Sequence, residues 1–282
     1  MLARVPASSA NLGPGFDALA VALTRYLEVS VEPAARFSIT SEGFGAGLFD
    51  DERHLGARVA AAVLGHDHFA IHVRSEIPLS RGLGSSASLA LAAAAAAGSE
   101  RALDIATQID GHAENAAASL RGGLVVASVN DRHVVTTRSL VLDPRWRFVA
   151  VVPDEELSTA DARQALPSHV PFKDAVHNVS AVAMLIAGLA HHEDFVPGSM
   201  DDFLHQPYRM SLLAFAQPLL GRLREAGAAG SCWSGAGSTM LALCDETSSP
   251  EVARAAQEFL ESHSVPGVVW ELDADRQGLQ LS

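Results

Sequence analysis

Hydrophobic positions along the chain follow two different spacings, which predict a mixture of strands and helices. Apolar and polar residues alternate over residues 26–32 and 69–74, as they do in strands with one buried face. Continuous apolar runs at residues 124–129 and 148–152 have the length of buried strands. Further strands are predicted at residues 37–41, within residues 231–245 and at residues 267–272, and two apolar stretches flank a turn-rich break within residues 3–31.

Helical spacing of apolar residues predicts helices between these strands. An alanine-dominated helix is expected to end at Gly98, because glycine readily adopts the left-handed conformation that closes a helix. Ser99 is placed to cap the next helix, whose apolar stripe runs to Ile109. The other predicted helices are residues 54–64, 178–190, 212–226 and 251–262.

Strands and helices mix over the whole length, which predicts an α+β fold. The 282 residues are enough for about two domains at ~150 residues each. Between the predicted cores, residues 131–147 are polar and contain Pro144. We therefore place the domain boundary there, with one domain in residues 1–142 and the other in residues 143–282.

Composition narrows the function. Twenty basic residues against thirty-three acidic ones give a net charge of −13, which disfavours a protein that binds nucleic acid through its overall field. Lys173 is the only lysine, and its neighbours fit neither a Walker A loop nor the strand lysine of a protein kinase.

Little in the sequence points to a membrane or to an oxidising compartment. Cys232 and Cys244 form neither a disulfide framework nor a C-x-x-C metal pair. The N-terminus lacks a long apolar segment. A long uncharged run, residues 82–99, is mostly Ala, Ser and Gly and is interpreted as a buried helix. We expect a cytoplasmic protein.

A glycine-rich segment before the alanine-dominated helix is the strongest chemical signal. Glycines let the backbone approach an anion, and the start of a helix offers unpaired N–H groups and a positive dipole end. Ser85 and Ser86 add hydroxyls that can reach a phosphate or Mg²⁺. The alternative is an ordinary helix with a serine cap. In so acidic a chain, bound phosphates would call for a divalent cation.

Three other polar segments are compatible with a site, although each alone fits a turn or a helix end equally well. Residues 110–115 (DGHAEN) bring a carboxylate, an imidazole and an amide within six positions. Residues 8–11 (SSAN), together with Asp17, form a turn-rich loop. Residues 234–238 (SGAGS) form a small-residue turn that a ligand could approach closely.

Together these segments resemble the GHMP kinases and, within them, the homoserine kinases. The matching segments are residues 78–87 (PLSRGLGSSA, the family's P-x3-G-L-G-S-S-A), 9–17 (SANLGPGFD), 111–115 (GHAEN) followed by 122–124 (GGL), 158–167 (STADARQALP), 204–209 (LHQPYR) and 233–237 (WSGAG). The resemblance thus covers nearly the whole chain.

The resemblance implies a two-domain fold, with an N-terminal mixed-sheet domain like the second domain of ribosomal protein S5 and a C-terminal ferredoxin-like domain. It also implies that ATP phosphorylates the side-chain hydroxyl of L-homoserine, on the route to threonine, with Mg²⁺. The nucleotide phosphates would be bound by Pro78, Arg81, Gly82, Leu83, Gly84, Ser85, Ser86 and Ala87. Mg²⁺ would be held by Ser86 and Asp110, and the amino acid by Asn11, Asp17, His112, Asn115, Arg163 and Arg209, of which Asn115 and Arg209 would be catalytic.

The chemistry of a zwitterionic amino acid calls for a similar set of residues. Its ammonium needs a carboxylate, here Asp17, and its carboxylate needs a planar guanidinium, here Arg163 and Arg209. For each arginine the alternative is a surface ion pair. Phosphoryl transfer asks mainly for positioning and charge neutralisation, so no general base is assigned. Replacing Gly84 by Val is expected to block ATP binding, by filling phosphate space, without unfolding the domain.

The sequence departs from the family pattern at several positions. His54 replaces a usual Asn near the base, Asp110 a usual Glu, and Glu114 a usual Asp. Ser238 stands in place of a proline. These changes leave two alternatives open: a GHMP kinase for another small hydroxylated metabolite, or a silent member that only binds ligand. A homodimer is compatible with the sequence, whereas nucleic-acid and membrane partners are not expected.

Overall fold

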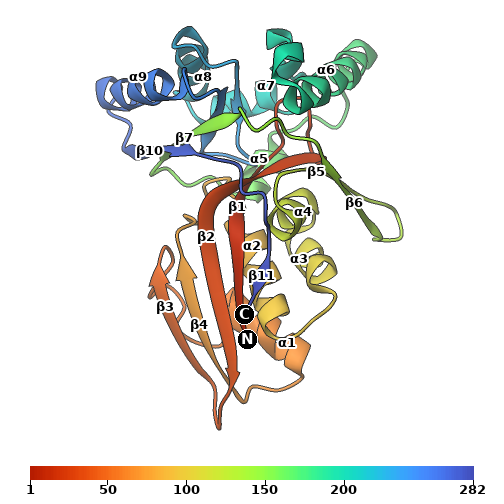
Figure 1. The fold of residues 1–282 in the computed structure, drawn as a ribbon, viewed down its shortest axis with the longest axis vertical. Coiled ribbons are helices and arrows are strands. Elements are labelled where there is room, and N and C mark those ends of the chain that lie inside the picture. The colour runs from red at the N-terminus through yellow and green to blue at the C-terminus, as the bar shows by residue number, and fades with distance from the viewer.

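The computed structural model describes residues 1–282, and its strands form two sheets (Figure 1). The first has seven strands in the order β11-β1-β2-β4-β3, with β5 paired to β2 and β6 to β5. Only β3 and β4 run parallel, so the sheet is mixed, as predicted. Its strands are β1 Leu2–Ala10, β2 Leu19–Pro33, β3 Ser38–Gly43, β4 Phe69–Ser75, β5 Leu124–Val129, β6 Val135–Leu140 and β11 Gln280–Leu281.

The second sheet is antiparallel and has four strands in the order β10-β7-β9-β8. They are β7 Arg147–Pro153, β8 Gly230–Trp233, β9 Met240–Cys244 and β10 Gly267–Leu272. In chain order, helices separate β7 from β8 and one helix separates β9 from β10. This is the β-α-β-β-α-β arrangement of a ferredoxin-like fold, which confirms the expectation for the second half.

The helices pack against these sheets. α2 and α4 contact β1 and β2, while α8 and α9 contact strands of the second sheet. The α-helices are α1 Leu55–Leu64, α2 Ser85–Ala96, α3 Ala102–Asp110, α4 Glu114–Arg121, α5 Thr159–Gln164, α6 Phe172–Ala190, α7 Gln206–Arg209, α8 Ala216–Glu225 and α9 Ser249–Ser262, with short 3₁₀ turns at His192–Asp194, Pro197–Met200 and Met210–Leu212. None of the helices is long and apolar enough to cross a membrane.

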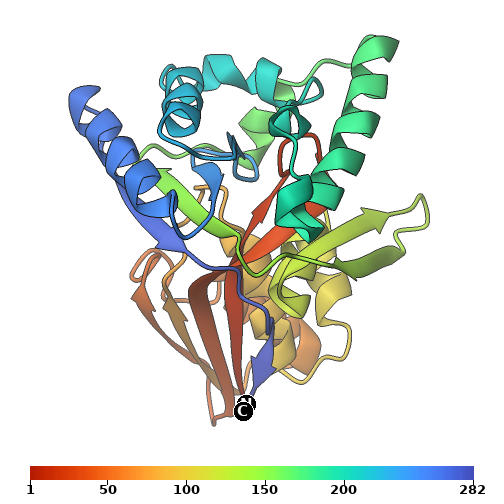
Figure 2. The same ribbon diagram turned by 45° about the horizontal axis from the view of Figure 1, so that its top comes forward.

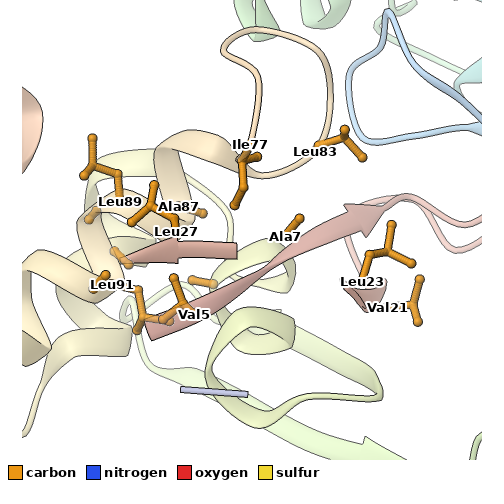
Figure 3. Close-up of a cluster of buried hydrophobic side chains, with 14 of the residues drawn as sticks. Val5, Ala7, Val21, Leu23, Leu27, Ile77, Leu83, Ala87, Leu89 and Leu91 are labelled. Carbon is orange, nitrogen blue, oxygen red and sulfur yellow. The ribbon is translucent and has the colours of Figure 1, made fainter. Parts of the chain in front are cut away.

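Helix α2 lies in the centre of the first half. Almost all of its residues are buried, because it packs on β1 and β2 and also on α1, α3 and α4. Its small alanines allow that close approach, and Leu89 and Leu91 lie beside Val5 and Leu27 (Figure 3). Gly98 closes the helix as predicted, with its φ at +89°. The buried packing fixes where the N-terminus of α2 lies.

Some expectations about elements were wrong. Ser99 does not cap α3; its hydroxyl accepts a hydrogen bond from Arg101 N, and the helix begins at Ala102. The helix predicted from residue 212 begins at Ala216, because Met210–Leu212 form a 3₁₀ turn and Leu213 is extended. Helices α4, α5 and α7 and strand β6 were not predicted, since each is too short to show a clear period.

Two chain segments connect the sheets. The first runs from β6 to β7, and the domain boundary predicted after residue 142 falls within it. The second runs from β10 back to β11, which pairs with β1, so that both termini lie together (Figures 1 and 2). Arg276 on the returning segment donates hydrogen bonds to Leu142 O at 3.0 Å and Asp143 O at 3.4 Å on the other segment. The two connections are thus joined to each other.

Candidate active site

Three loops meet where the two halves face each other. We name them the opening loop (residues 8–17), the phosphate loop (residues 78–86) and the third loop (residues 234–238). Backbone hydrogen bonds join Ser8 N to Leu83 O at 3.2 Å and Gly235 N to Ala10 O at 2.8 Å. The Ser234 hydroxyl lies 2.7 Å from Gly82 O. Each loop therefore fixes the position of the other two.

A cavity of about 130 Å³ lies between these loops. It brings together most of the predicted site residues: Asn11, Arg81, Gly82, Gly84, Ser85, Ser86, Ala87, Asp110, His112, Asn115, Arg163 and Arg209. Leu157 and Thr159 also line it and were not predicted. Pro78 and Leu83 do not line it, because both are buried beneath the phosphate loop. Asp17 does not line it either and is exposed, ion-paired with Arg163.

The phosphate loop ends at the N-terminus of α2. Gly84 is the N-cap residue, with its φ at +71°, and no side chain caps the helix. The N–H groups of the first turn, beginning at Ser85, have no partner within the helix. Together with the positive end of the helix dipole, they make a site suited to a phosphate.

The space around Gly84 contradicts the reason first given for its sensitivity. A Cβ on Gly84 would lie 2.2 Å from Ser8 Oγ, which belongs to the protein and not to phosphate space. A valine would therefore disturb the junction of the phosphate and opening loops. That the domain stays folded remains a prediction, but a loss of stability is expected as well.

We expect Gly84→Ala to lower the free energy of unfolding more than Gly98→Ala does. Both glycines have positive φ, but a Cβ on Gly98 would meet open space. The control should lose about 1–2 kcal/mol from the left-handed backbone alone. Gly84→Ala should lose about 1–3 kcal/mol more from overpacking. Urea unfolding of both variants measures the difference, and equal losses would contradict the contact with Ser8.

Asn11 joins two of the loops. Its Oδ1 accepts from Asp17 N at 2.8 Å, and its Nδ2 donates to Gly235 O at 3.0 Å. Its φ of +60° is left-handed, which Asn tolerates better than most residues. Asn11 lines the cavity, but most of its side-chain hydrogen bonding serves to shape the opening loop.

Asn115, near the start of α4, is buried against the opening loop. Its Oδ1 accepts from the Ser8 hydroxyl at 3.0 Å. In this orientation of the amide, Nδ2 makes no hydrogen bond inside the chain. Because Asn115 lines the cavity, that N–H₂ group is available to a ligand.

Two residues predicted for opposite ends of a zwitterion contact each other. Arg163, on α5, donates from Nη2 to Asp17 Oδ1 at 2.8 Å and from Nη1 to Asp17 Oδ2 at 3.1 Å. Both side chains are more than one-third exposed, at 40% and 38%. Such an exposed pair stabilises the fold little and can exchange partners readily.

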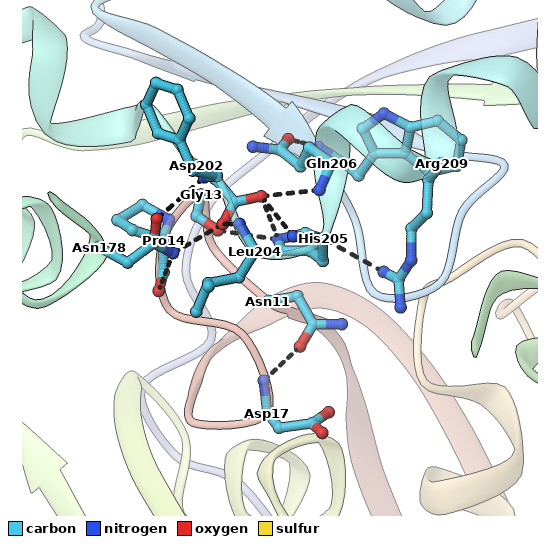
Figure 4. Close-up of polar contacts among 12 residues, drawn as sticks. Asn11, Gly13, Pro14, Asp17, Asn178, Asp202, Leu204, His205, Gln206 and Arg209 are labelled. Atoms are coloured by element: carbon cyan, nitrogen blue, oxygen red, sulfur yellow. Dashed lines mark hydrogen bonds and ion pairs between the residues drawn. The ribbon is translucent and has the colours of Figure 1, made fainter. Parts of the chain in front are cut away.

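Arg209, on α7 (Figure 4), is almost fully buried, whereas the Arg163 side chain is 40% exposed. Its Nη1 donates to Gly235 O at 3.1 Å, and its Nε donates to Ala162 O at 3.3 Å. Burial, and then the charge of Arg163, lower its pKa to about 10, so it stays cationic at neutral pH. Nη2 makes no hydrogen bond inside the chain and is left for a ligand.

His205 orients Arg209 and was not predicted as a site residue. Its Nδ1 lies 3.2 Å from Arg209 Nη1, and its Nε2 lies 2.9 Å from Gly13 O. An arginine and a carbonyl fix the tautomer, because Nδ1 must accept and Nε2–H must donate. Burial lowers the pKa of His205 to about 4, which keeps the ring neutral.

Asp202 holds this arrangement in place (Figure 4). Its carboxylate accepts from the N–H groups of His205 at 3.0 Å and Gln206 at 2.7 Å, and from Asn178 Nδ2 at 2.7 Å. An Asp just before a short Pro-containing helix is a capping signal that sequence reasoning could have used. The spacing of His205 and Arg209, four residues apart on one helix face, was a second such signal.

Asp110, His112 and Glu114 form a polar cluster at the edge of the cavity. His112 Nδ1 lies 2.9 Å from Glu114 Oε1 and 3.5 Å from Asp110 Oδ2. Burial acts to lower the pKa of His112, but the neighbouring carboxylates of Glu114 and Asp110 outweigh it and raise that pKa overall. Burial raises the pKa of Asp110, although the Ser86 hydroxyl, His112 and Arg163 oppose the change.

No group of three or more His, Cys, Asp or Glu side chains is arranged to hold a metal ion. Mg²⁺ in kinases is commonly held by one or two protein oxygens and by substrate phosphates, without a protein cage. Ser86 and Asp110 both line the cavity and can supply two such oxygens. The residues present therefore fit Mg²⁺ only when it arrives with phosphates.

Arg81 was predicted at the phosphates but is largely engaged elsewhere. Its Nε donates to Pro153 O at 2.8 Å and its Nη1 to Leu79 O at 3.0 Å. Its guanidinium is also close to Glu156, at 3.3 Å. Arg81 thus ties the phosphate loop to the end of β7.

A second cavity, of about 250 Å³, adjoins the first and is mostly apolar. Both cavities are lined by Ser80, Ser85 and Ser86, so they meet at the phosphate loop. Its other walls include Phe44, Leu48, Phe49, His54, Leu79 and Leu89. A ligand with an anionic part and a flat apolar part could occupy both.

Comparison with known proteins agrees with this geometry. The family model of the GHMP kinases N terminal domain matches residues 53–129, and that of the GHMP kinases C terminal matches residues 187–262. A homoserine kinase of Desulfitobacterium hafniense is 34% identical over 290 residues, covering 98% of this chain and 97% of that protein. One from Rhodococcus erythropolis is 40% identical over 281 residues, covering 90% and 89%. The crystal structure of homoserine kinase from Cytophaga hutchinsonii has a TM-score of 0.86 at 25% identity, covering 99% and 96%.

Proposed function

The chain belongs to the homoserine kinases within the GHMP kinases, and from this membership we propose that it transfers the γ-phosphoryl group of ATP to the side-chain hydroxyl of L-homoserine. One observation carries the proposal. A single cavity contains the phosphate-binding start of α2 together with Arg163 and Arg209, and Asp17 lies at its rim. A zwitterionic alcohol and a triphosphate find complementary charges there.

ATP occupies both cavities in this proposal. Its phosphates lie at the first turn of α2, and its base lies in the apolar cavity beyond Ser85 and Ser86. Ser86 and Asp110 would hold the Mg²⁺ that accompanies the nucleotide. When bound, the ion neutralises charge on the triphosphate. Burial disfavours the charged form of Asp110, and a cation beside it offsets that cost.

Homoserine lies between the opening loop and α7. Arg209 Nη2 and the guanidinium of Arg163 bind its carboxylate, while Asp17 binds its ammonium. On binding, the contact between Asp17 and Arg163 is thus replaced by contacts of Asp17 with the ammonium and of Arg163 with the carboxylate of the amino acid. His112 contributes to the same pocket and is oriented by Glu114.

The reaction needs positioning more than proton abstraction. Asn115 Nδ2–H₂ donates to the substrate hydroxyl oxygen and orients it for in-line attack. The first-turn amides of α2 hold the transferred phosphoryl group, and no side chain is assigned as a general base. A loose transition state makes little demand on a strong base.

We expect an ATP-consumption screen to give the highest kcat/KM with L-homoserine among homoserine, threonine, serine, mevalonate and other small alcohols. The physical reason is the pairing of one acidic and two basic side chains with a zwitterion. Detection of O-phosphohomoserine by mass spectrometry confirms the product. Strong turnover of a non-amino acid alone would overturn the assignment in favour of another small-metabolite kinase. ATP binding without turnover of any alcohol would indicate a silent member.

A further inference from the structure

His54 lines the apolar cavity and also caps helix α1. Its Nδ1 accepts a hydrogen bond from Gly56 N at 3.1 Å, which satisfies one of the unpaired N–H groups at the start of that helix. The residue is 9% exposed, and its Nε2 makes no hydrogen bond within the chain. His54 is therefore the one imidazole among the residues that line the apolar cavity, with one of its two nitrogens already used.

The cap determines which nitrogen carries the proton. A ring nitrogen that accepts from a backbone N–H has its lone pair free and holds no hydrogen. In the neutral ring the proton then lies on Nε2. Burial lowers the pKa of His54 and outweighs the opposing charges of Asp50 and Asp51, so the ring is neutral around pH 7. Toward the cavity His54 thus offers one N–H donor and no acceptor.

We propose that His54 is a specificity-determining residue for the nucleotide base: its Nε2–H donates to one ring nitrogen of the purine and does not recognise the 6-amino group. The inference rests on the proposed function only in placing the base in this cavity. An exocyclic amino group offers hydrogens, and a donor-only imidazole has nothing with which to receive them. An amide side chain, in contrast, can donate to a ring nitrogen of adenine and accept from its 6-amino group at the same time.

The test uses a variant that keeps the cap and removes the donor. In His54→Ser the serine hydroxyl can cap α1, since Ser is among the preferred N-cap residues, but it is too short to reach the base. We expect kcat/KM for ATP to fall by roughly 3- to 10-fold, the size of one neutral hydrogen bond. Purine riboside triphosphate, which keeps every ring nitrogen and lacks the 6-amino group, should show the same loss.

Deaza analogues, in which carbon replaces one ring nitrogen of the purine, identify the nitrogen to which His54 donates. One of 1-, 3- and 7-deaza-ATP should lower kcat/KM of the wild-type enzyme by the same factor as the substitution does. The same analogue should not lower kcat/KM of His54→Ser any further. His66→Ser is the matched control, because His66 Nδ1 also accepts from an N–H two residues on, at 3.2 Å, but in an exposed position outside both cavities. It should leave every constant unchanged. Melting temperatures of both variants verify that the fold is kept.

Two outcomes would overturn the proposal. If His54→Ser impairs ATP more than purine riboside triphosphate, the ring accepts from the amino group and the tautomer is the other one. If His54→Ser uses ATP as well as the wild type does, His54 does not contact the base. Failure of the proposed function is distinguishable, because then the wild-type enzyme would not phosphorylate homoserine with any of these nucleotides.

Discussion

Replacing Arg209 by alanine is expected to raise the KM for L-homoserine by roughly 30-fold or more, from the 2–5 kcal/mol lost when a buried charged hydrogen-bonded partner is removed. Arg209 is buried, and its free Nη2 faces the cavity. The KM for ATP should change little, because Arg209 lies with the opening and third loops and not at the start of α2. Steady-state kinetics with each substrate varied in turn measure both constants.

The anchoring role of Arg209 requires controls, since it also holds Gly235 O and Ala162 O. Arg209→Lys keeps a charge but loses the planar fork, so it should also weaken homoserine binding. The substrate analogue 3-aminopropan-1-ol lacks the carboxylate and should be poor for the wild type and little worse for Arg209→Ala. Equal losses on both substrates would assign Arg209 to the fold or the phosphates and remove the main physical support for an amino-acid substrate.

Replacing Asp110 by asparagine is expected to lower kcat by on the order of 100-fold and to raise the Mg²⁺ concentration needed for half-maximal rate, because a metal ion contributes several kcal/mol of charge stabilisation. The amide keeps the size of the side chain and removes its charge. Since burial raises the pKa of Asp110, a proton competes with Mg²⁺ at this carboxylate. The Mg²⁺ requirement of the wild type should therefore increase as pH falls, and that of the variant should not.

Asp104→Asn is the matched control for this experiment. Asp104 is also on α3, but it is exposed and paired with Arg101 at 3.2 Å. Its replacement should leave the rate and the Mg²⁺ dependence unchanged. An unchanged metal dependence in Asp110→Asn would move the ligand role to another group.

The sequence predicted long and strongly patterned features well. The buried strands, α2 with its closing Gly98 and the phosphate loop were visible because each depends on local spacing or on a glycine conformation. The ferredoxin-like strand order was expected from family resemblance and not from the pattern itself. Short helices such as α4 and α7 were not predicted, because helices of this length depend on tertiary packing more than on a visible period.

The sequence predicted which residues form the site better than it predicted what each of them contacts. That Asn11 would donate to Gly235 O, or that Arg81 would bind the end of β7, depends on residues far away in the chain. Long-range pairing of this kind has no signature in a single sequence. His205 and Asp202 are different, because their contacts with Arg209 and with the start of α7 are local, and the Asp before α7 and the four-residue spacing were signals that could have been used.

The two chain connections between the sheets, joined to each other by Arg276, restrict how the cavity can change its width. A single covalent connection would leave the two halves free to turn about three independent axes. Here two connections are tied to each other by Arg276, and hydrogen bonds from Gly235 N to Ala10 O and from the Ser234 hydroxyl to Gly82 O join the halves again at the cavity itself. Residues from both halves face the cavity, with Ser86 and Asp110 on one side and Arg163 and Arg209 on the other. Their separation is therefore set by the fold, so a substrate that fits the arginines meets the phosphates at a set distance.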